Sequence, residues 1–228
     1  MCQMMSKDKS QALNLPHFIT VEGGEGAGKT TLIKSLESAI LSAGLPVLIT
    51  REPGGTPFGE EVRRWLLTHQ KAIKIGARAE LMLFLAARAQ HIEDVIAPAI
   101  TAGSVVICDR FNDSTVAYQG AGRGLGVEWV RSLCNALCGA TVPDLTFFLD
   151  IDPQTGLERT RRLTKEHATA GETDRIEGER LEFHQTVRQA FIEMSQVEPD
   201  RFHCIDATMP ADAVAATAIA VLERKLYV

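Results

Sequence analysis

The chain has 228 residues, of which 45% are hydrophobic and 23% charged, and its mean hydropathy is zero. This length suits one domain with at most a small lid, and the composition is that of an ordinary globular protein. A formal net charge of −5 argues against a general nucleic-acid binder. No apolar run approaches the roughly 18 residues of a membrane span, so no membrane partner is expected.

The amino-terminal segment and the cysteines bear on the domain boundary and on the cellular location. Residues 1–16 are polar at their start and lack the apolar core of a secretory signal, so they are predicted to be a disordered tail before a single domain at 17–228. Cys134 and Cys138 stand four residues apart with no histidine nearby, which favours buried thiols over zinc ligands. Reduced thiols without an export signal indicate a cytoplasmic protein.

Apolar runs of four to six residues alternate with helical patterns along the chain. The expected strands are residues 17–22, 46–50, 104–109, 144–151 and 202–206. The expected helices are residues 31–43, 58–68, 79–101, 127–138, 153–163, 179–198 and 210–226, and Pro98 should kink or shorten the third. This order predicts an α/β fold with a doubly wound parallel five-stranded sheet, whose ligands gather at the carboxyl ends of the strands.

The first expected strand runs into a glycine-rich loop that fits G-x-x-x-x-G-K-[ST]. This phosphate-binding loop, or P-loop, lies between a strand and a helix, which is the context that the motif requires. Its backbone N–H groups and the following helix dipole would hold a polyphosphate. Lys29 would reach the β- and γ-phosphates, and the Thr30 hydroxyl would hold Mg²⁺. The residues expected to bind the nucleotide are Gly23, Gly24, Glu25, Gly26, Ala27, Gly28, Lys29, Thr30 and Thr31.

Three further stretches carry groups suited to a phosphorylated ligand. Arg51 follows the second strand and could grip a phosphate bidentately. Phe84 and Arg88 share one helical face, so a ring and a guanidinium could act on one base, although a phenylalanine taken alone is more often a core residue. Asp109 and Arg110 end the third strand, where a carboxylate could hold hydrated Mg²⁺ and an arginine could bridge two phosphoryl groups.

A fourth stretch, residues 161–175, combines arginines with small residues and a glycine. Such a segment is typical of a mobile lid that carries cations to a polyphosphate. Taken alone, the stretch favours a solvated basic helix end.

Together these features resemble the thymidylate kinase family. The matching segments are residues 22–30, 51–56, 84–90, 109–111, 114–124, 143–145, 174–177 and 205–208. The resemblance implies a nucleoside-monophosphate-kinase-like P-loop NTPase domain that transfers the γ-phosphoryl group of ATP to dTMP. The products would be ADP and dTDP, a step of dTTP synthesis, with Mg²⁺ required. It also implies a homodimer built on helix faces.

The resemblance assigns roles in the acceptor site by position. Arg51 and Arg110 would hold the phosphate of dTMP, and Glu25 would contact its sugar or a phosphate-bound water. Phe84 would stack on thymine, and Arg88 would bond its O4 edge. Thr115 would lie near N3 of thymine, with Gln119 close by. Tyr118 would press against C2′ of the sugar and so exclude the 2′-hydroxyl of a ribonucleotide.

Two departures from the family pattern matter. The family places a catalytic arginine in the P-loop or in the lid, and the variable P-loop positions here carry no basic residue. The resemblance therefore implies the bacterial lid-arginine type, with Arg161 preferred as the catalytic residue and Arg162 on ATP. Phe111 stands where tyrosine is frequent.

Two other functions fit part of the pattern. The first is another deoxynucleotide or deoxynucleoside kinase. A deoxynucleoside kinase needs a carboxylate base to deprotonate a sugar hydroxyl, and Glu22 or Glu25 could serve. A P-loop switch ATPase would hold or hydrolyse nucleotide without a small acceptor, but it would have no use for Arg51, Phe84 and Arg88.

Overall fold

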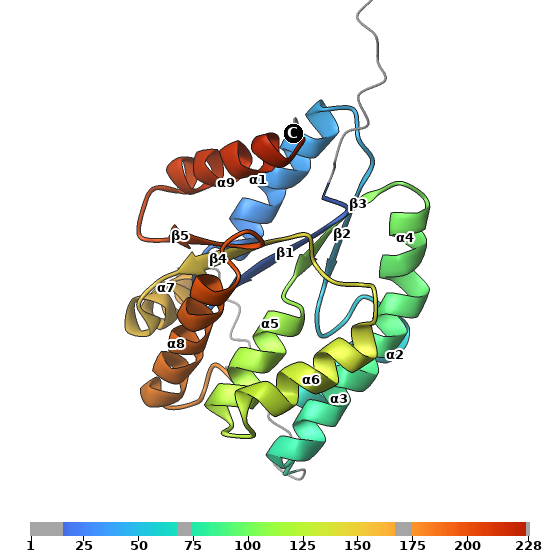
Figure 1. The fold of residues 1–228 in the computed structure, drawn as a ribbon. Coiled ribbons are helices and arrows are strands. Elements are labelled where there is room, and N and C mark those ends of the chain that lie inside the picture. The colour runs from blue at the N-terminus through green and yellow to red at the C-terminus, as the bar shows by residue number, and fades with distance from the viewer. Residues whose placement is uncertain (1–15, 68–73, 167–174, 227–228) are drawn as a thin grey trace, which may run out of the picture.

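The computed structural model describes residues 16–67, 74–166 and 175–226. In this part of the chain, five strands form one sheet in the order β2-β3-β1-β4-β5, and all four neighbouring pairs are parallel (Figure 1). The strands are β1 (Phe18–Gly23), β2 (Val47–Arg51), β3 (Val105–Asp109), β4 (Leu145–Asp150) and β5 (Phe202–Asp206). Each lies within one residue of its expected range, and the predicted fold class is confirmed.

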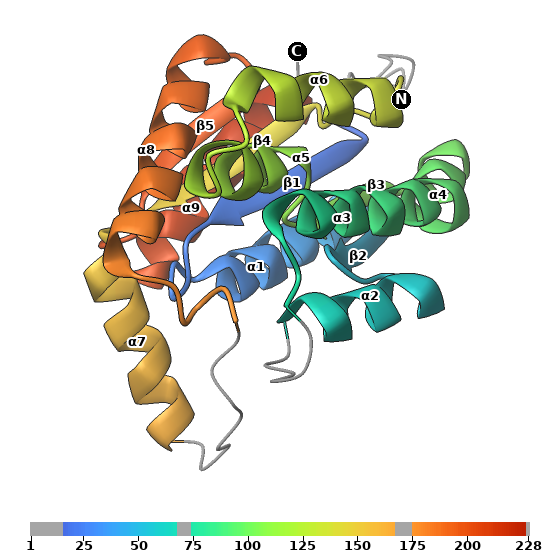
Figure 2. The same ribbon diagram turned by 90° about the horizontal axis from the view of Figure 1, so that it is seen from below.

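Helices cover both faces of the sheet. α1 and α9 pack together on one face, and α4, α5 and α8 contact strands on the other (Figures 1 and 2). The helical segments are α1 (Lys29–Ser42), α2 (Pro57–Leu67), α3 (Ala77–His91), η1 (Ile92–Ile96), α4 (Ala97–Thr101), α5 (Asn112–Thr115), η2 (Val116–Gly122), α6 (Val127–Cys138), α7 (Pro153–Glu166), α8 (Leu181–Val197) and α9 (Ala211–Leu226). None of these helices is long and apolar enough to cross a membrane.

The central strand β1 is buried along its whole length because both faces of the sheet are covered. Ile19 and Val21 belong to the cluster shared with α1, whereas Phe18 belongs to the cluster on the opposite side. Burying one such aliphatic side chain stabilises the fold by about 1.5–3 kcal/mol. This two-sided burial explains why the strands appear in the sequence as continuous apolar runs.

Two helical regions differ from expectation. Pro98 does not shorten the helix of residues 79–101, because the π-helix η1 precedes it and Ala97 N–H bonds the carbonyl of Ile92, five residues back. The wider turn changes the hydrogen-bond register before the proline, which itself has no N–H. Residues 112–122 form α5 and η2, where no helix was expected. Their glycines and short polar residues are poor helix formers, and burial of the segment outweighs that preference.

The expected cysteine environment is confirmed for the thiols inside the fold. Cys108, Cys134 and Cys138 are free and buried, whereas Cys204 is free and exposed. Burial raises the pKa of the Cys134 thiol to about 11, so it is neutral and unreactive at physiological pH. The tail prediction for residues 1–16 falls almost entirely outside the described residues, which begin at Pro16.

Candidate active site

An open pocket of ≈ 480 Å³ lies at the carboxyl ends of β1, β2 and β3. Backbone hydrogen bonds join these three ends: Glu52 N–H donates to Asp109 C=O, and Arg110 N–H donates to Val21 C=O. The pocket brings together most residues that the sequence singles out, namely Glu25, Gly26, Ala27, Gly28, Lys29, Thr30, Thr31, Arg51, Phe84, Arg88, Asp109, Arg110, Thr115, Tyr118 and Gln119. Of the other four, Gly23 and Gly24 lie at the start of the same loop, and Arg161 and Arg162 lie on α7.

The P-loop joins β1 to α1 through backbone that only glycine adopts readily. Gly26 and Gly28 have φ angles of 67° and 94°, in the left-handed region. A Cβ at Gly26 would lie 2.1 Å from the carbonyl oxygen of Gly156, and one at Gly156 would lie 2.3 Å from that of Glu25. The P-loop is therefore pressed directly against the first turn of α7.

Lys29 is the first residue of α1, so its charge adds to the positive end of that helix dipole. Its Nζ donates to the carbonyl oxygens of Gly23 and Gly24, at 3.1 and 3.0 Å. Burial and the neighbouring charge of Arg110 lower the pKa of Lys29. The ammonium group is thus held over the loop that would cradle a polyphosphate.

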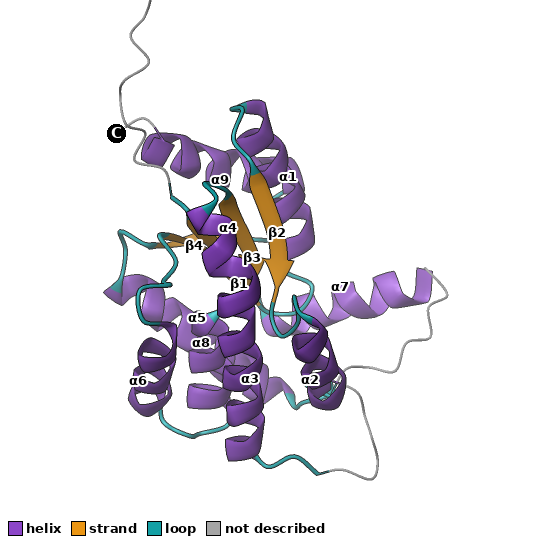
Figure 3. Ribbon diagram, turned by 90° about the vertical axis from the view of Figure 1, so that its right-hand side faces the viewer, coloured by secondary structure: helices purple, strands orange, loops and turns teal. Residues whose placement is uncertain are grey.

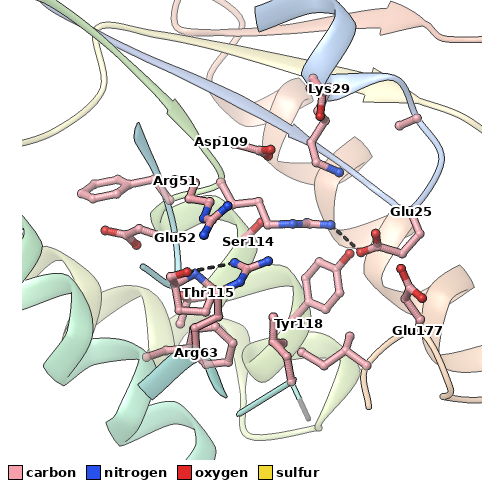
Figure 4. Close-up of a pocket in the computed structure, with 18 of the residues that line it drawn as sticks. Glu25, Lys29, Arg51, Glu52, Arg63, Asp109, Ser114, Thr115, Tyr118 and Glu177 are labelled. Carbon is pink, nitrogen blue, oxygen red and sulfur yellow. Dashed lines mark hydrogen bonds and ion pairs between the residues drawn. The ribbon is translucent and has the colours of Figure 1, made fainter. Parts of the chain in front are cut away.

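Arg110 lines the pocket from the end of β3, among Glu25, Ser114 and Tyr118, which are labelled in Figure 4. Its Nη2 donates to Glu25 Oε1 at 2.6 Å, its Nη1 donates to Ser114 Oγ at 3.2 Å, and its guanidinium lies 5.1 Å from the Tyr118 ring centroid. Its φ of 68° is unusual for a non-glycine residue and costs of order 1–3 kcal/mol. Burial acts to raise the pKa of Glu25, but the charges of Arg110 and Lys29 outweigh it and lower that pKa.

The buried carboxylate of Glu22 bonds the segment that follows Arg110. Its carboxylate accepts hydrogen bonds from the Phe111 backbone N–H at 2.7 Å and from Ser114 Oγ at 2.6 Å. Complete burial, together with the charge of Asp113, raises the pKa of Glu22 to about 7. Because Glu22 is fully buried and does not line the pocket, the geometry gives it no contact with a substrate hydroxyl.

The far end of the pocket is lined by Phe84, Arg88 and Thr115. Arg88 is 1% exposed, and its Nη2 donates to Thr115 Oγ1 at 3.0 Å. Its guanidinium lies 4.8 Å from the ring centroid of Phe111, which is fully buried. Phe84 both packs on apolar residues of α2 and α3 and faces the pocket, so its two predicted roles are compatible.

Sequence reasoning missed a buried carboxylate that connects several elements. Glu80, at the start of α3, accepts hydrogen bonds from Gln119 Nε2 at 2.9 Å and Arg123 Nε at 3.0 Å, and also from Arg175 Nη2. Arg175 additionally bonds the end of α2 through its backbone N–H and the carbonyl of Leu67. A glutamate inside the apolar run of residues 79–85 was the available signal.

Arg63 is a pocket residue that sequence reasoning also missed. It lines the pocket from α2, and its Nη1 donates to the carbonyl oxygen of Pro53 at 2.9 Å. Together with Arg51, Arg88 and Arg110 it brings four guanidinium groups to the pocket. A phosphate group would therefore be attracted to the pocket.

The two expected Mg²⁺ ligands face the same space. Thr30 is exposed on the first turn of α1, and Asp109 ends β3. Asp109 Oδ1 is buried without a hydrogen-bond partner in the part of the chain that the structure describes. One hydroxyl and one such carboxylate suit Mg²⁺, which keeps several waters and needs few protein ligands.

The two candidate lid arginines lie outside the pocket. Arg161 and Arg162 are exposed on α7, which stands away from the body of the molecule (Figure 3). Residues 167–174 of the expected lid are outside the described residues. The choice between the two arginines stays a prediction.

Comparison with known proteins agrees with this geometry. The family model described as "Thymidylate kinase" matches residues 21–218. The chain is 51% identical over 209 residues to "Thymidylate kinase" of Protochlamydia amoebophila, covering 92% of this chain and 93% of that protein. It is 48% identical over 211 residues to "Thymidylate kinase" of Magnetococcus marinus, covering 92% and 97%.

A solved structure extends the likeness to three dimensions. The crystal structure of thymidylate kinase from Ehrlichia chaffeensis has a TM-score of 0.69 and 32% sequence identity, and the match covers 90% of this chain and 97% of that one. These shares leave no large part of the fold unmatched. The chain therefore belongs to the thymidylate kinase family.

Proposed function

We propose that this enzyme transfers the γ-phosphoryl group of ATP to dTMP, forming ADP and dTDP for dTTP synthesis, and that it requires Mg²⁺. One observation carries the proposal: a P-loop and an acceptor site with three arginines and an aromatic ring share a single pocket. ATP would lie along Gly23–Thr31, with its γ-phosphate near Lys29. The phosphate of dTMP would lie at Arg51 and Arg110, with thymine between Phe84 and Arg88.

The side chains in the pocket suit charge stabilisation and alignment. The phosphate oxygen of dTMP is already a nucleophile, so positioning and neutralisation of charge would supply most of the rate. Arg110 is held by Glu25 and Ser114, and such contacts lower the cost of ordering its side chain. Lys29 and Arg110 both line the pocket, where Lys29 would neutralise charge at the γ-phosphate and Arg110 at the acceptor phosphate.

Mg²⁺ would be held by Thr30 and Asp109 and would neutralise negative charge on the phosphates. Arg161 is proposed as the lid arginine that adds charge to the transferring group, with Arg162 on ATP. The support is that the P-loop itself contributes only one cation, Lys29. The remaining acceptor contacts proposed are Thr115 and Gln119 at the base and Tyr118 at C2′ of the sugar. Tyr118 is 5% exposed, so its ring is held in place by its neighbours and would form one side of the sugar site.

A coupled assay with ATP tests the substrate and the metal. We expect dTMP to be consumed, thymidine to be left, and turnover to stop when EDTA removes Mg²⁺. Turnover of thymidine alone would identify a deoxynucleoside kinase. The geometry disfavours that activity because Glu22 is buried away from the pocket and Glu25 is paired with Arg110. ATP hydrolysis unaffected by dTMP would indicate a switch ATPase.

We also propose a homodimer in the cytoplasm. Phe58 and Trp65 on α2 and Met82 on α3 are 48%, 49% and 46% exposed, and these two helices pack side by side. Such neighbouring apolar side chains are typical of a protein interface. Light scattering should give twice the chain mass of 24.9 kDa, and Trp65→Glu should shift it to the monomer value. A monomeric wild type would refute this part of the proposal.

A further inference from the structure

A chain of buried polar groups lies behind the base end of the pocket. Glu52 Oε2 lies 2.7 Å from Arg88 Nε and Nη2, and Glu52 Oε1 lies 2.9 Å from His91 Nδ1. His91 Nε2 lies in turn 2.6 Å from Thr50 Oγ1. His91 is fully buried, and Glu52 is 5% exposed. The four residues form a continuous network from β2 to the arginine that faces the proposed thymine site.

The chemistry of the network fixes the direction of the hydrogen bonds to Glu52. The Glu52 carboxylate can only accept, so Nδ1–H of His91 donates to it. Nε2 faces the Thr50 hydroxyl, which can donate to the ring or accept from it. The charges of Glu52 and Arg88 balance one another in the protein interior, where an unpaired charge would be costly.

The same imidazole also holds the loop that carries Arg51. Gly55 has a φ of 78°, and a Cβ there would lie 2.4 Å from His91 Nε2. The ring therefore touches the loop of residues 50–55 at Thr50, Glu52 and Gly55. Arg51 is the last residue of β2, where this segment begins, and it lines the pocket at the proposed phosphate end.

We infer that His91 is a positioning residue for the acceptor nucleotide. It orients Glu52, which orients Arg88 at the base end, and it fixes the loop that presents Arg51 at the phosphate end. His91 does not itself touch the ligand, because it is fully buried and does not line the pocket. The inference rests on the proposed function, since it takes dTMP to lie along Arg51 and Arg88.

Two substitutions separate this role from simple filling of space. The amide nitrogen of His91→Asn falls near the position of Nδ1 and can still donate to Glu52, whereas that of His91→Gln falls near Nε2 and cannot. We expect His91→Gln to raise the dTMP KM about tenfold or more, as for a lost hydrogen bond to a charged group. His91→Asn should raise it clearly less. The ATP KM should stay within about twofold of wild type in both, because the network serves the acceptor only.

His203→Gln is the matched control. His203 lies on β5, at the edge of the sheet opposite β2, and should leave both KM values unchanged. Equal effects of the two His91 variants, a larger effect of His91→Asn, or an equal rise in the ATP KM would overturn the inference. Loss of dTMP turnover in the wild type and in His203→Gln would instead show that the proposed function is wrong.

A double-mutant cycle with Arg88→Met tests whether His91 acts through Arg88. If it does, His91→Gln should raise the dTMP KM less than about threefold in the Arg88→Met background. An undiminished tenfold effect there would refute the relay. If His91→Gln does not fold, Thr50→Val removes the other end of the network. A dTMP KM raised about threefold would support the inference, and an unchanged one would overturn it.

Discussion

The half of the pocket around Arg51, Arg88 and Arg110 is held by side chains, whereas the half around Lys29 is built from backbone. Each of these three arginines is paired with a carboxylate: Glu60, Glu52 and Glu25, respectively. On the other side, glycines expose N–H groups, and Lys29 bonds only backbone carbonyls of the loop in the contacts that the structure describes. Paired guanidinium groups suit recognition of one defined ligand. Backbone amides suit any polyphosphate, which is why the P-loop occurs in many enzymes.

The largest expected effect comes from the backbone-built half. Lys29→Ala removes the cation that we propose to lie nearest the transferring phosphoryl group, and it should lower kcat about a thousandfold, with dTMP affinity little changed. Stopped assays and calorimetric titration of dTMP measure the two quantities. Lys34→Ala, an exposed lysine on the same helix, is the control. Equal losses in kcat and dTMP affinity would show that the two halves are not independent.

The next effect should identify the lid arginine. Arg161→Ala should lower kcat about a hundredfold, whereas Arg162→Ala should mainly raise the ATP KM. Steady-state kinetics with each substrate varied separately distinguish these outcomes. Mild and equal effects in both variants would remove α7 from the mechanism and leave charge stabilisation to Lys29 and Arg110.

A third test concerns the carboxylate behind Arg110. Unfolded Glu22 has a pKa of 4.5, and the folded protein raises that pKa to about 7, so the native state binds more protons between these values. The free energy of unfolding should therefore fall as pH rises through this window, by up to roughly 3 kcal/mol. Urea unfolding at pH 5 and pH 7.5 measures this change. Glu22→Gln should lack this contribution, and an identical pH dependence in both proteins would contradict it.

The smallest of these effects is expected in the half of the pocket that side chains form. Phe84→Ala should raise the dTMP KM about tenfold and leave kcat within about threefold, because it removes a stacking surface and no charge. Val197→Ala, which truncates an exposed apolar residue of α8, is the control. A fall in kcat and in thermal stability without a change in KM would assign the ring to the core.

The sheet and most of the pocket could be predicted because their signals are local. Strands buried on both faces appear as apolar runs, and Gly23–Thr30 carries its whole motif within eight residues. The partners of the arginines could not be predicted in this way. Glu52 lies 36 residues from Arg88, and Glu80 lies 39 from Gln119, so only the fold brings them together. The helix over 112–122 was missed because burial, and not local preference, forms it.

The contact between Gly26 and Gly156 has a mechanical consequence. Neither glycine has a β-carbon, so the two backbones touch directly. A movement of the P-loop backbone when a triphosphate binds would therefore displace the first turn of α7. Because a helix rises about 1.5 Å per residue, Arg161 lies roughly 7 Å along α7 from Gly156. If α7 tilts by ~10° about this contact, Arg161 would move by about 1 Å. A spin label on the last turns of α7 would therefore report whether a triphosphate is bound at the P-loop.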